Sequence, residues 1–428
     1  MKAVVLVALL GLLACGSASG ATGRNAGSTP STTFSSAPSP SSAASPSATP
    51  LPSSAPSPSA ALIPSPSPAA AGTPPPVAVT CTSQIPTGHE LALVTLRNST
   101  DIVVRDISDI STPVTRCAFK TCSQYCQTFG PLFTRFVTAT EISYIVNNGS
   151  GSAAMYLADL QTRTTKLIRA WSDDDGSYYW VFAWSPDGNT LSYLSPTAWR
   201  LWSAAGDLAL STLGTMPGYN FNVNSPDSET VGFSADGQYV ALDQSLASQT
   251  NTVPHPSKFE VVRLSDHKMV YSRTDGIMAT WAAKGARLYF RTSSGVEAWD
   301  PASGVQVVAP GLAWINPWPS ADGKRIAYST VDAKGNHFAA YLRLTDQPAT
   351  QVQLSALPRA GAGFLTSTLV WYAGEQVCGP TVQCGYNETN LNGPPPTGLT
   401  YIHDLATGTV STSIIAAFID SWPHFNAA

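Results

Sequence analysis

Trp184-Ser-Pro-Asp-Gly188, followed by Leu191-Ser-Tyr-Leu194, is the stretch that decides the fold, because the same phrase recurs along the 428 residues. The other two strong copies are Phe233-Ser-Ala-Asp-Gly237 before Val240-Ala-Leu-Asp243 and Pro319-Ser-Ala-Asp-Gly323 before Ile326-Ala-Tyr-Ser329. The aspartate hydrogen-bonds the backbone that follows it, and the glycine supplies the positive φ of a tight reversal. The next four residues are apolar or alternate, as in a buried strand. The phrase predicts a hairpin whose structural turn residues are Asp187, Gly188, Asp236, Gly237, Asp322 and Gly323.

Weaker copies of this turn precede four further apolar segments, at 91–94, 142–145, 288–291 and 369–372, which makes seven copies in all. A second turn phrase, clearest in His403-Asp-Leu-Ala-Thr-Gly408, lies between the first ones and also occurs seven times. The repeat length is about 50 residues, and two hairpins in such a unit give the four strands of a propeller blade. The sequence therefore predicts an all-β fold, a single β-propeller of about seven four-stranded blades.

The two ends of the repeat region bear on blade count and ring closure. The repeats begin at Leu91 with what reads as the second strand of a blade, and residues 420–426 read as a first strand without a partner. We expect this C-terminal strand to complete blade one, because an open ring would leave two unpaired strand edges. Six blades plus an irregular cap over Cys81 to Cys126 would produce a similar spacing and is the alternative.

The first fourteen residues read as a signal peptide. They combine Lys2 with an apolar run that is too short for a lasting membrane span. The run ends in Leu12-Leu13-Ala14-Cys15, which resembles the bacterial lipobox. That resemblance implies cleavage before Cys15 and a lipid on its sulfur, and more than one acyl chain gives stable anchoring. A plain secretory peptide, cut at a small-residue site such as Ser17-Ala18-Ser19, is the alternative.

Residues 15–80 read as a disordered tether. They are dominated by Ser, Pro and Ala and hold too few aromatic and branched residues to bury a core. The expected organisation is a signal peptide at 1–14, a tether at 15–80 and a propeller at 81–428. The expected location is outside the cytoplasm, where only the N-terminal lipid would attach the protein to the bacterial cell membrane.

Six cysteines follow the lipobox, and an even number outside the cytoplasm indicates disulfides. Cys378 and Cys384 are the safest predicted pair because the loop between them is short. The remaining four are Cys81, Cys117, Cys122 and Cys126. They allow three pairings, and the sequence does not choose between them.

The repeated phrases resemble those of TolB-type propellers, which are similar to WD repeats, and of the N-terminal propellers of dipeptidyl peptidases. The resemblance extends from about Gly88 to the end of the chain and is carried by the three Ser-x-Asp-Gly copies. It implies the fold. Four of the seven inner turns depart from the pattern, and neither a hydrolase domain nor a Gly-x-Ser-x-Gly nucleophile elbow is found. A role through protein partners, as in TolB, follows only by analogy.

Charge and motif content argue against several functions. The chain has 23 basic and 27 acidic residues, for a formal net charge of −4 at pH 7, and no basic run. That balance excludes a nucleic-acid footprint and docking on anionic lipid. The six histidines show no metal-binding spacing, and the acidic run Asp173–Asp175 lacks the ligand pattern of a calcium loop. We therefore assign no catalytic residue, no metal and no cofactor.

The connections between strands suggest where binding occurs. In a propeller the two hairpin turns of each blade lie on one face, and all other connections lie on the opposite face. The long segments 117–134, 171–180, 245–258 and 375–398 belong to the second group. Long loops on a rigid scaffold commonly carry binding sites. The candidate binding residues in and beside them are Trp171, Tyr178, Tyr179, His255 and Tyr386. The aromatic ones also have a second interpretation, as caps over blade edges.

The function expected from these features is that of a non-enzymatic, surface-displayed binding or scaffold lipoprotein. Its partner would be a protein or a cell-wall glycan held at the loop-rich face. The alternative is a propeller enzyme, a metal-assisted lyase or hydrolase with its site at the central channel. Histidines and carboxylates clustered at the channel mouth would distinguish that enzyme.

Overall fold

The computed structural model describes most of the repeat region, and every described residue belongs to the unit Leu62–Ala428. The described residues are 73–82, 84–95, 101–109, 111–120, 134–147, 152–171, 178–195, 198–212, 232–243, 259–333, 336–359, 362–373, 400–413 and 424–425. All regular elements among them are β-strands, in seven antiparallel sheets. No helix in these ranges is long and apolar enough to cross a membrane.

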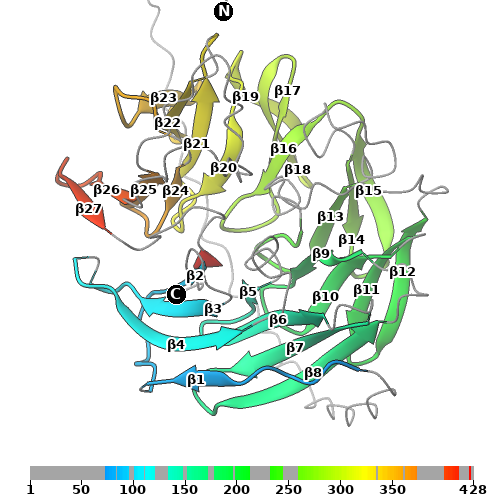
Figure 1. The fold of residues 1–428 in the computed structure, drawn as a ribbon. Helices are drawn as coiled ribbons and strands as arrows, with labels where there is room; N and C mark the ends of the chain where they lie inside the picture. The colour runs from blue at the N-terminus through cyan, green and yellow to red at the C-terminus, as the bar shows by residue number, and fades with distance from the viewer. Residues whose placement is uncertain are drawn as a thin grey trace, which may run out of the picture. The chain divides into compact units, whose positions relative to one another are not determined.

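Each sheet is one blade, and the seven blades form a ring (Figure 1), so the predicted seven-bladed propeller is confirmed. Blade one contains β1 (Val79–Cys81), β2 (Leu91–Thr95), β3 (Asp101–Asp106), β4 (Val114–Lys120) and β28 (His424–Phe425). Blade two contains β5 (Arg135–Phe136), β6 (Glu141–Asn147), β7 (Ala153–Asp159) and β8 (Thr164–Trp171). Blade three contains β9 (Tyr178–Trp184), β10 (Thr190–Leu194), β11 (Ala198–Ser203) and β12 (Gly206–Thr212).

The other four blades follow in chain order. Blade four contains β13 (Tyr239–Asp243), β14 (Phe259–Arg263) and β15 (Lys268–Arg273), and a bridge from Phe233 to Val240 marks its first strand. Blade five contains β16 (Ile277–Trp281), β17 (Leu288–Thr292), β18 (Gly295–Asp300) and β19 (Gly304–Pro310). Blade six contains β20 (Ile315–Pro319), β21 (Arg325–Val331), β22 (His337–Arg343) and β23 (Thr350–Gln353). Blade seven contains β24 (Gly363–Phe364), β25 (Leu369–Ala373), β26 (Thr400–Asp404) and β27 (Val410–Ser413).

The C-terminus closes the ring as the sequence predicts. β28 pairs antiparallel with β2, with Ala92 opposite Phe425 and Leu93 opposite His424. The last strand of the chain is therefore the innermost strand of the first blade. This pairing covers the edge of β2 that a linear order of repeats would leave unpaired.

Antiparallel pairing gives the ring two distinct faces. We call the face with the two hairpin turns of each blade the turn face, and the opposite one the loop face. The loop face carries the starts of the first and third strands of each blade and the ends of the second and fourth. In blade six, for example, Asn316 and His337 lie toward the loop face, whereas Asp322 lies in a turn on the other.

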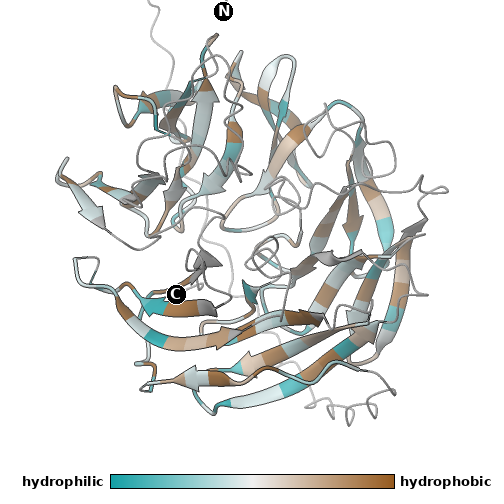
Figure 2. Ribbon diagram, in the orientation of Figure 1, coloured by the Kyte–Doolittle hydropathy of each residue, from teal (hydrophilic) through white to brown (hydrophobic). Residues whose placement is uncertain are grey.

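The core consists of seven apolar clusters rather than one, and each cluster joins two neighbouring blades. Apolar residues accordingly concentrate along the strands (Figure 2). Blades five and six share a cluster around the fully buried Trp314, and blades seven and one share a smaller one around Trp371 and Ala92. Alternate residues of one strand serve different clusters: Leu288 and Phe290 of β17 face blade four, and Tyr289 faces blade six. The ring is thus held together at its seams.

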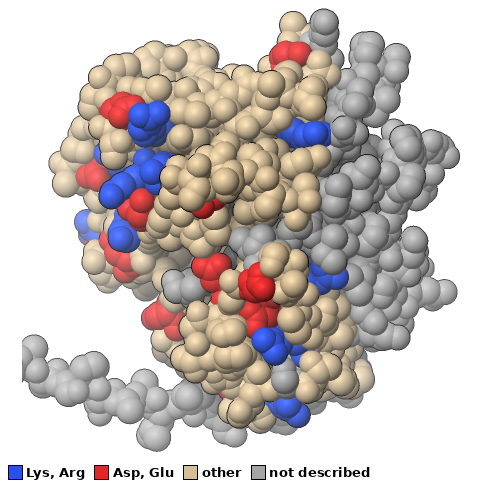
Figure 3. Space-filling model, turned by 90° about the vertical axis from the view of Figure 1, so that its left-hand side faces the viewer, with Lys and Arg blue, Asp and Glu red and all other residues tan. Residues whose placement is uncertain are grey.

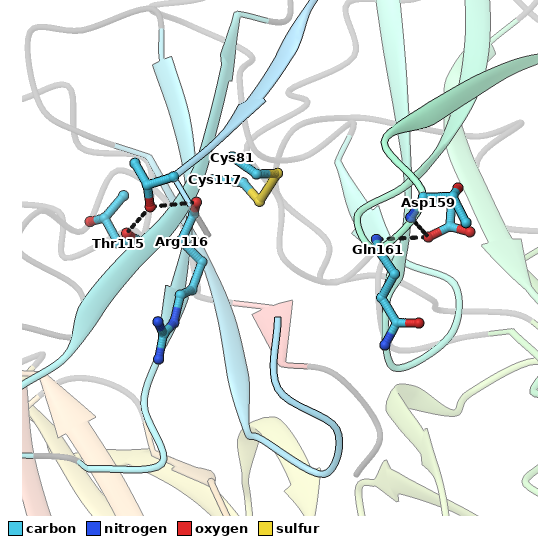
Figure 4. Close-up of a disulfide and its surroundings, with 8 residues drawn as sticks. Cys81, Thr115, Arg116, Cys117, Asp159 and Gln161 are labelled. Atoms are coloured by element: carbon cyan, nitrogen blue, oxygen red, sulfur yellow. Dashed lines mark hydrogen bonds between the residues drawn. A yellow bond between two sulfur atoms is a disulfide. The ribbon is translucent and has the colours of Figure 1, made fainter. Parts of the chain in front are cut away.

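Blade one has a fifth strand that the sequence analysis places in the tether. β1 pairs with the outer strand β4, with Val79 opposite Phe119 and Cys81 opposite Cys117. Residues 73–82, which we call the N-terminal arm, are therefore part of the fold, which begins before the expected boundary at residue 81. A disulfide joins Cys81 to Cys117 (Figure 4) and selects one of the three pairings left open.

Candidate functional site

The Ser-x-Asp-Gly phrases form the predicted turns, and their aspartates are engaged inside them. Asp187 Oδ1 accepts hydrogen bonds from Ser185 Oγ at 2.5 Å and from the Asn189 backbone N–H at 3.1 Å. Burial opposes the ionisation of Asp187, but these bonds outweigh it and hold its pKa below the usual value. Gly188 has φ +70°. Asp236 with Gly237 and Asp322 with Gly323 repeat this arrangement. These carboxylates serve the turns.

The predicted binding residues are not brought together in the described structure. The Trp171 side chain is 3% exposed and packs edge-on against Tyr193, with ring centroids 6.2 Å apart, in the seam between blades two and three. Trp171 is thus a buried residue of this seam. Tyr178 and Tyr179 begin β9, but only their backbone is described. Seven other residues named in the sequence analysis lie outside the described residues: His255, Tyr386, Cys122, Cys126, Cys378, Cys384 and Cys15.

Blade six holds an unusual group of buried polar side chains, which we call the blade-six polar set: Asn316, Tyr328, Ser329 and His337. Among the described residues, none of the following buried atoms has a hydrogen-bond partner: both amide atoms of Asn316, the hydroxyls of Tyr328 and Ser329, and Nδ1 of His337. Tyr328 and Ser329 are fully buried, and Asn316 is 9% exposed. A buried polar group without a partner costs roughly 1–3 kcal/mol, so most native proteins pair such groups. Four of them in one blade call for an explanation.

Three members of the set lie on the paired strands β20 and β21. Tyr328 faces blade five together with Ile326, whereas Ser329 lies on the side of Ala327, which faces blade seven. Ile315 of β20 lies opposite Ser329 of β21, and a register shift then places Asn316 and Pro317 across from Tyr328. Asn316 has φ +50°, the left-handed conformation that asparagine tolerates better than most residues. All members lie in the half of blade six nearest the loop face, and His337 begins β22 at that face.

The neighbouring blade shows the same irregular backbone without the polar side chain. Met278 of β16 also has φ +50°, within a register shift between Ile277 and Thr280. Trp314, which precedes β20, hydrogen-bonds two strands of blade five. Its Nε1 donates to the carbonyl of Met278 in β16 at 3.1 Å, and its own carbonyl accepts from Nη1 of Arg291 in β17 at 2.7 Å. This bulge thus occurs in the inner strands of both blade five and blade six, and the unpaired amide distinguishes blade six.

A buried cation and two tyrosines adjoin the set at the seam with blade seven. The Arg359 backbone N–H donates to the His337 carbonyl at 2.8 Å. The Arg359 guanidinium, in a residue only 6% exposed, lies 4.6 Å from the centre of the Tyr401 ring, and Nη2 donates to its hydroxyl at 3.4 Å. Tyr401 stacks on Tyr372, with ring centroids 5.5 Å apart. Cation and aromatic faces therefore lie beside neutral hydrogen-bonding groups.

The protonation states of the set follow from burial. Burial lowers the pKa of His337, so its imidazole is neutral at pH 7. Burial raises the pKa of the Tyr328 hydroxyl well above its usual value, so it stays protonated. Every member is then an uncharged group that both donates and accepts hydrogen bonds. None of them is a carboxylate, so the set is suited to recognition by hydrogen bonds.

Several other charged groups in the described structure form ion pairs. On the turn face of blade one, Asp106 accepts from Arg116 Nη2 at 2.6 Å and from His89 Nδ1 at 2.7 Å. Between blades two and three, Asp207 bonds Arg169, Arg200 and the Tyr193 hydroxyl. Acidic and basic side chains lie side by side on the surface shown in Figure 3. In the described ranges no three His, Cys, Asp or Glu side chains are placed to hold a metal ion.

The sequence contains one signal for this site that the repeat analysis overlooks. Asn316-Pro317 interrupts an inner strand, where the matching positions of blade five are the apolar Met278-Ala279, and an Asn-Pro pair within a strand indicates a bulge. The lack of a partner for the amide depends on packing between strands, which no local pattern reveals. Tyr328 and Ser329 lie in the strand Ile326-Ala-Tyr-Ser329 and read as ordinary strand residues.

Comparison with known proteins yields similarity of fold. No protein-family model matches the sequence, and no curated protein matches it. TolB from Acinetobacter baumannii is 15% identical over 78% of this chain and 82% of that chain, with a TM-score of 0.37. An oligogalacturonate lyase in complex with manganese is 11% identical over 78% and 84%, with a TM-score of 0.46. The Cps50 (Swd1) β-propeller domain of Myceliophteria thermophila is 12% identical over 70% and 97%, with a TM-score of 0.37.

TolB and another β-propeller are thus among the solved structures to which this chain is similar. The seven sheets and the closing strand establish the propeller independently of these similarities.

Proposed function

We propose that this protein is a non-enzymatic binding or scaffold protein that uses the loop face of its propeller to hold a protein or cell-wall glycan. The observation that supports this most directly is the blade-six polar set, because its neutral donors and acceptors lack partners within the described fold. Groups that are costly to leave unpaired persist where they serve a function. Their neutrality favours a partner recognised by hydrogen bonds.

The sequence extends this proposal to location. The lipobox-like Leu12-Leu13-Ala14-Cys15 and the Ser/Pro-rich tether favour a lipoprotein held at the outer side of the cell membrane. The Cys81–Cys117 disulfide agrees with an oxidising compartment. A tether of this length would leave the propeller free to meet partners in the cell envelope.

The test is a capture experiment with the full chain, carrying an affinity tag inserted in the tether, against envelope extract and purified cell-wall glycan. Wild type is compared with Asn316→Leu and with a turn-face control, Lys268→Ala, whose side chain is 75% exposed. We expect wild type and the control to retain the same partner and Asn316→Leu to lose it. Thermal melting of each variant shows that the fold is intact.

Two other outcomes would count against the proposal. A partner retained by all three proteins would place binding away from blade six. Absence of a partner, together with bound metal and bond cleavage in the same preparation, would favour the enzyme alternative with a site at the central channel.

A further inference from the structure

The N-terminal arm is attached to two blades at once. On blade one, β1 extends the sheet beyond β4, and Thr82 follows with two bonds to the Arg116 carbonyl, from its backbone N–H at 2.8 Å and from its Oγ1 at 3.1 Å. Figure 4 shows the side-chain bond beside the disulfide. The arm therefore covers an outer strand edge that would otherwise be open to pairing.

On blade two, the arm is held by two tyrosines. The Tyr156 hydroxyl donates to the Pro74 carbonyl at 2.5 Å, and the Tyr144 hydroxyl donates to the Val77 carbonyl at 3.2 Å. Their rings stack with centroids 5.7 Å apart. Val77 and Val79 pack against the apolar cluster that joins blades one and two. The arm thus bridges the outer part of this seam.

These contacts alone form a weak attachment. β1 has only three residues, and the backbone entropy lost on ordering each arm residue is at least as large as the net gain from one hydrogen bond. The disulfide joins cysteines 36 residues apart, and closing a loop of that size removes much of the conformational entropy that the chain would gain on release. The covalent bond is therefore the main attachment of the arm.

We infer that residues 73–82 form a strap that a dithiol reductant releases from an otherwise intact propeller. The reductant is oxidised to its own disulfide, and the Cys81–Cys117 bond takes up its two electrons and two protons to give two thiols. The arm then leaves β4 and the two tyrosines. The ring stays closed, because β28 pairs with β2 on the inner side of blade one, away from the arm.

Release changes the reach of the chain and the surface of blade one. Ten residues pass from the fold to the segment that precedes it, which adds up to about 33 Å when extended. The outer edge of β4 and the apolar seam beneath the arm become accessible at the same time. A redox change would thereby alter both the spacing of the propeller from its N-terminal attachment and the surface it presents.

Hydrogen exchange on the full chain, with and without dithiothreitol, tests the inference. We expect amides of β1 and of the facing residues 117–119 to exchange at least tenfold faster after reduction, while amides of β21 and β22 keep their rates. Cys81→Ser/Cys117→Ser should show the same pattern without reductant and with the other cysteines unchanged. Tyr156→Phe should not accelerate exchange of the arm further in the reduced protein, because the arm has already left that hydroxyl.

Either of two results would overturn the inference. Unchanged exchange of β1 in both the reduced protein and the double variant would mean that the non-covalent contacts hold the arm. Faster exchange throughout β21 and β22 on reduction would mean that the disulfide supports the whole ring rather than a strap.

Discussion

Replacing Tyr328 by Phe should make the protein more stable, although the residue is fully buried. The change removes one hydroxyl and keeps the ring, which packs near Trp314 with centroids 6.1 Å apart. That hydroxyl has no hydrogen-bond partner among the described residues. An unpaired buried hydroxyl costs roughly 1–3 kcal/mol, and the small void left by the oxygen offsets part of the gain. We expect the free energy of unfolding to rise by about 1 kcal/mol.

Tyr193 provides the matched control. It is also buried, lies in the second strand of its blade, and donates its hydroxyl to Asp207 Oδ2 at 2.6 Å. A hydrogen bond to a charged group is worth about 1.5–3 kcal/mol. Tyr193→Phe should therefore lower the free energy of unfolding by about 2 kcal/mol. The loss is not larger because Asp207 keeps its ion pairs with Arg169 and Arg200. The same chemical change then has opposite signs in blades six and three.

Urea denaturation of the full chain, followed by tryptophan fluorescence, measures both effects. Wild type, Tyr328→Phe and Tyr193→Phe are compared by their midpoints at equal slope, since an unchanged slope means that the same surface is exposed on unfolding. If Tyr328→Phe destabilises the protein as Tyr193→Phe does, the Tyr328 hydroxyl is paired in solution. The blade-six polar set would then lose its central premise.

Three further predictions concern other parts of the chain. Although burial opposes the ionisation of Asp106, the hydrogen bond from Arg116 and its other bonds bring its pKa from 3.8 to about 2. The lowered pKa stabilises the fold above about pH 4 by roughly 2 kcal/mol, and this stabilisation is lost as the pH falls toward 2. Asp106→Asn should lack this pH dependence, which is measured as the melting temperature against pH. Gly188→Ala should lower stability by about 2 kcal/mol and Gly237→Ala by about 1 kcal/mol. Both glycines have positive φ, but only at position 188 would the added Cβ press on blade two, 3.1 Å from a side-chain carbon of Val137. Thermal melts of the two variants measure the difference. Cys15→Ser should abolish incorporation of a labelled fatty acid into the protein, and label retained by that variant would contradict lipidation at this position.

Local sequence signals predict the blades well and the arm poorly. Each Ser-x-Asp-Gly turn closes within a few residues, as in Ser185 to Thr190, so its chemistry is visible in the sequence. The arm contains three consecutive prolines and reads as tether, because its partners are distant along the chain. Cys117 lies 36 residues from Cys81, and Tyr156 lies 82 residues from Pro74. Pairing over such distances leaves no local periodicity.

The candidate site shows the same division. The loop-rich face follows from strand order, but the aromatic residues expected there could not be sorted into exposed and buried ones. Trp171 belongs to a seam because the register of β8 points it at blade three, and a shift of one residue would reverse that. The blade-six polar set is defined by the lack of hydrogen-bond partners, which depends on how the strands pack and is not visible in the sequence.

The division of the core into seams restricts how such a ring can be rebuilt. Leu288 and Phe290 pack against blade four, whereas Tyr289 packs against blade six. Each blade therefore has two different packing surfaces, one for each neighbouring blade. Exchanging two blades would mismatch up to four seams at once, whereas circular permutation would preserve every one. New chain ends placed in a connection between blades, with residue 428 joined to residue 73 by a linker, would therefore test whether blade order or chain order specifies the ring. A duplicated blade, by contrast, must adapt both of its sides before an enlarged ring can close.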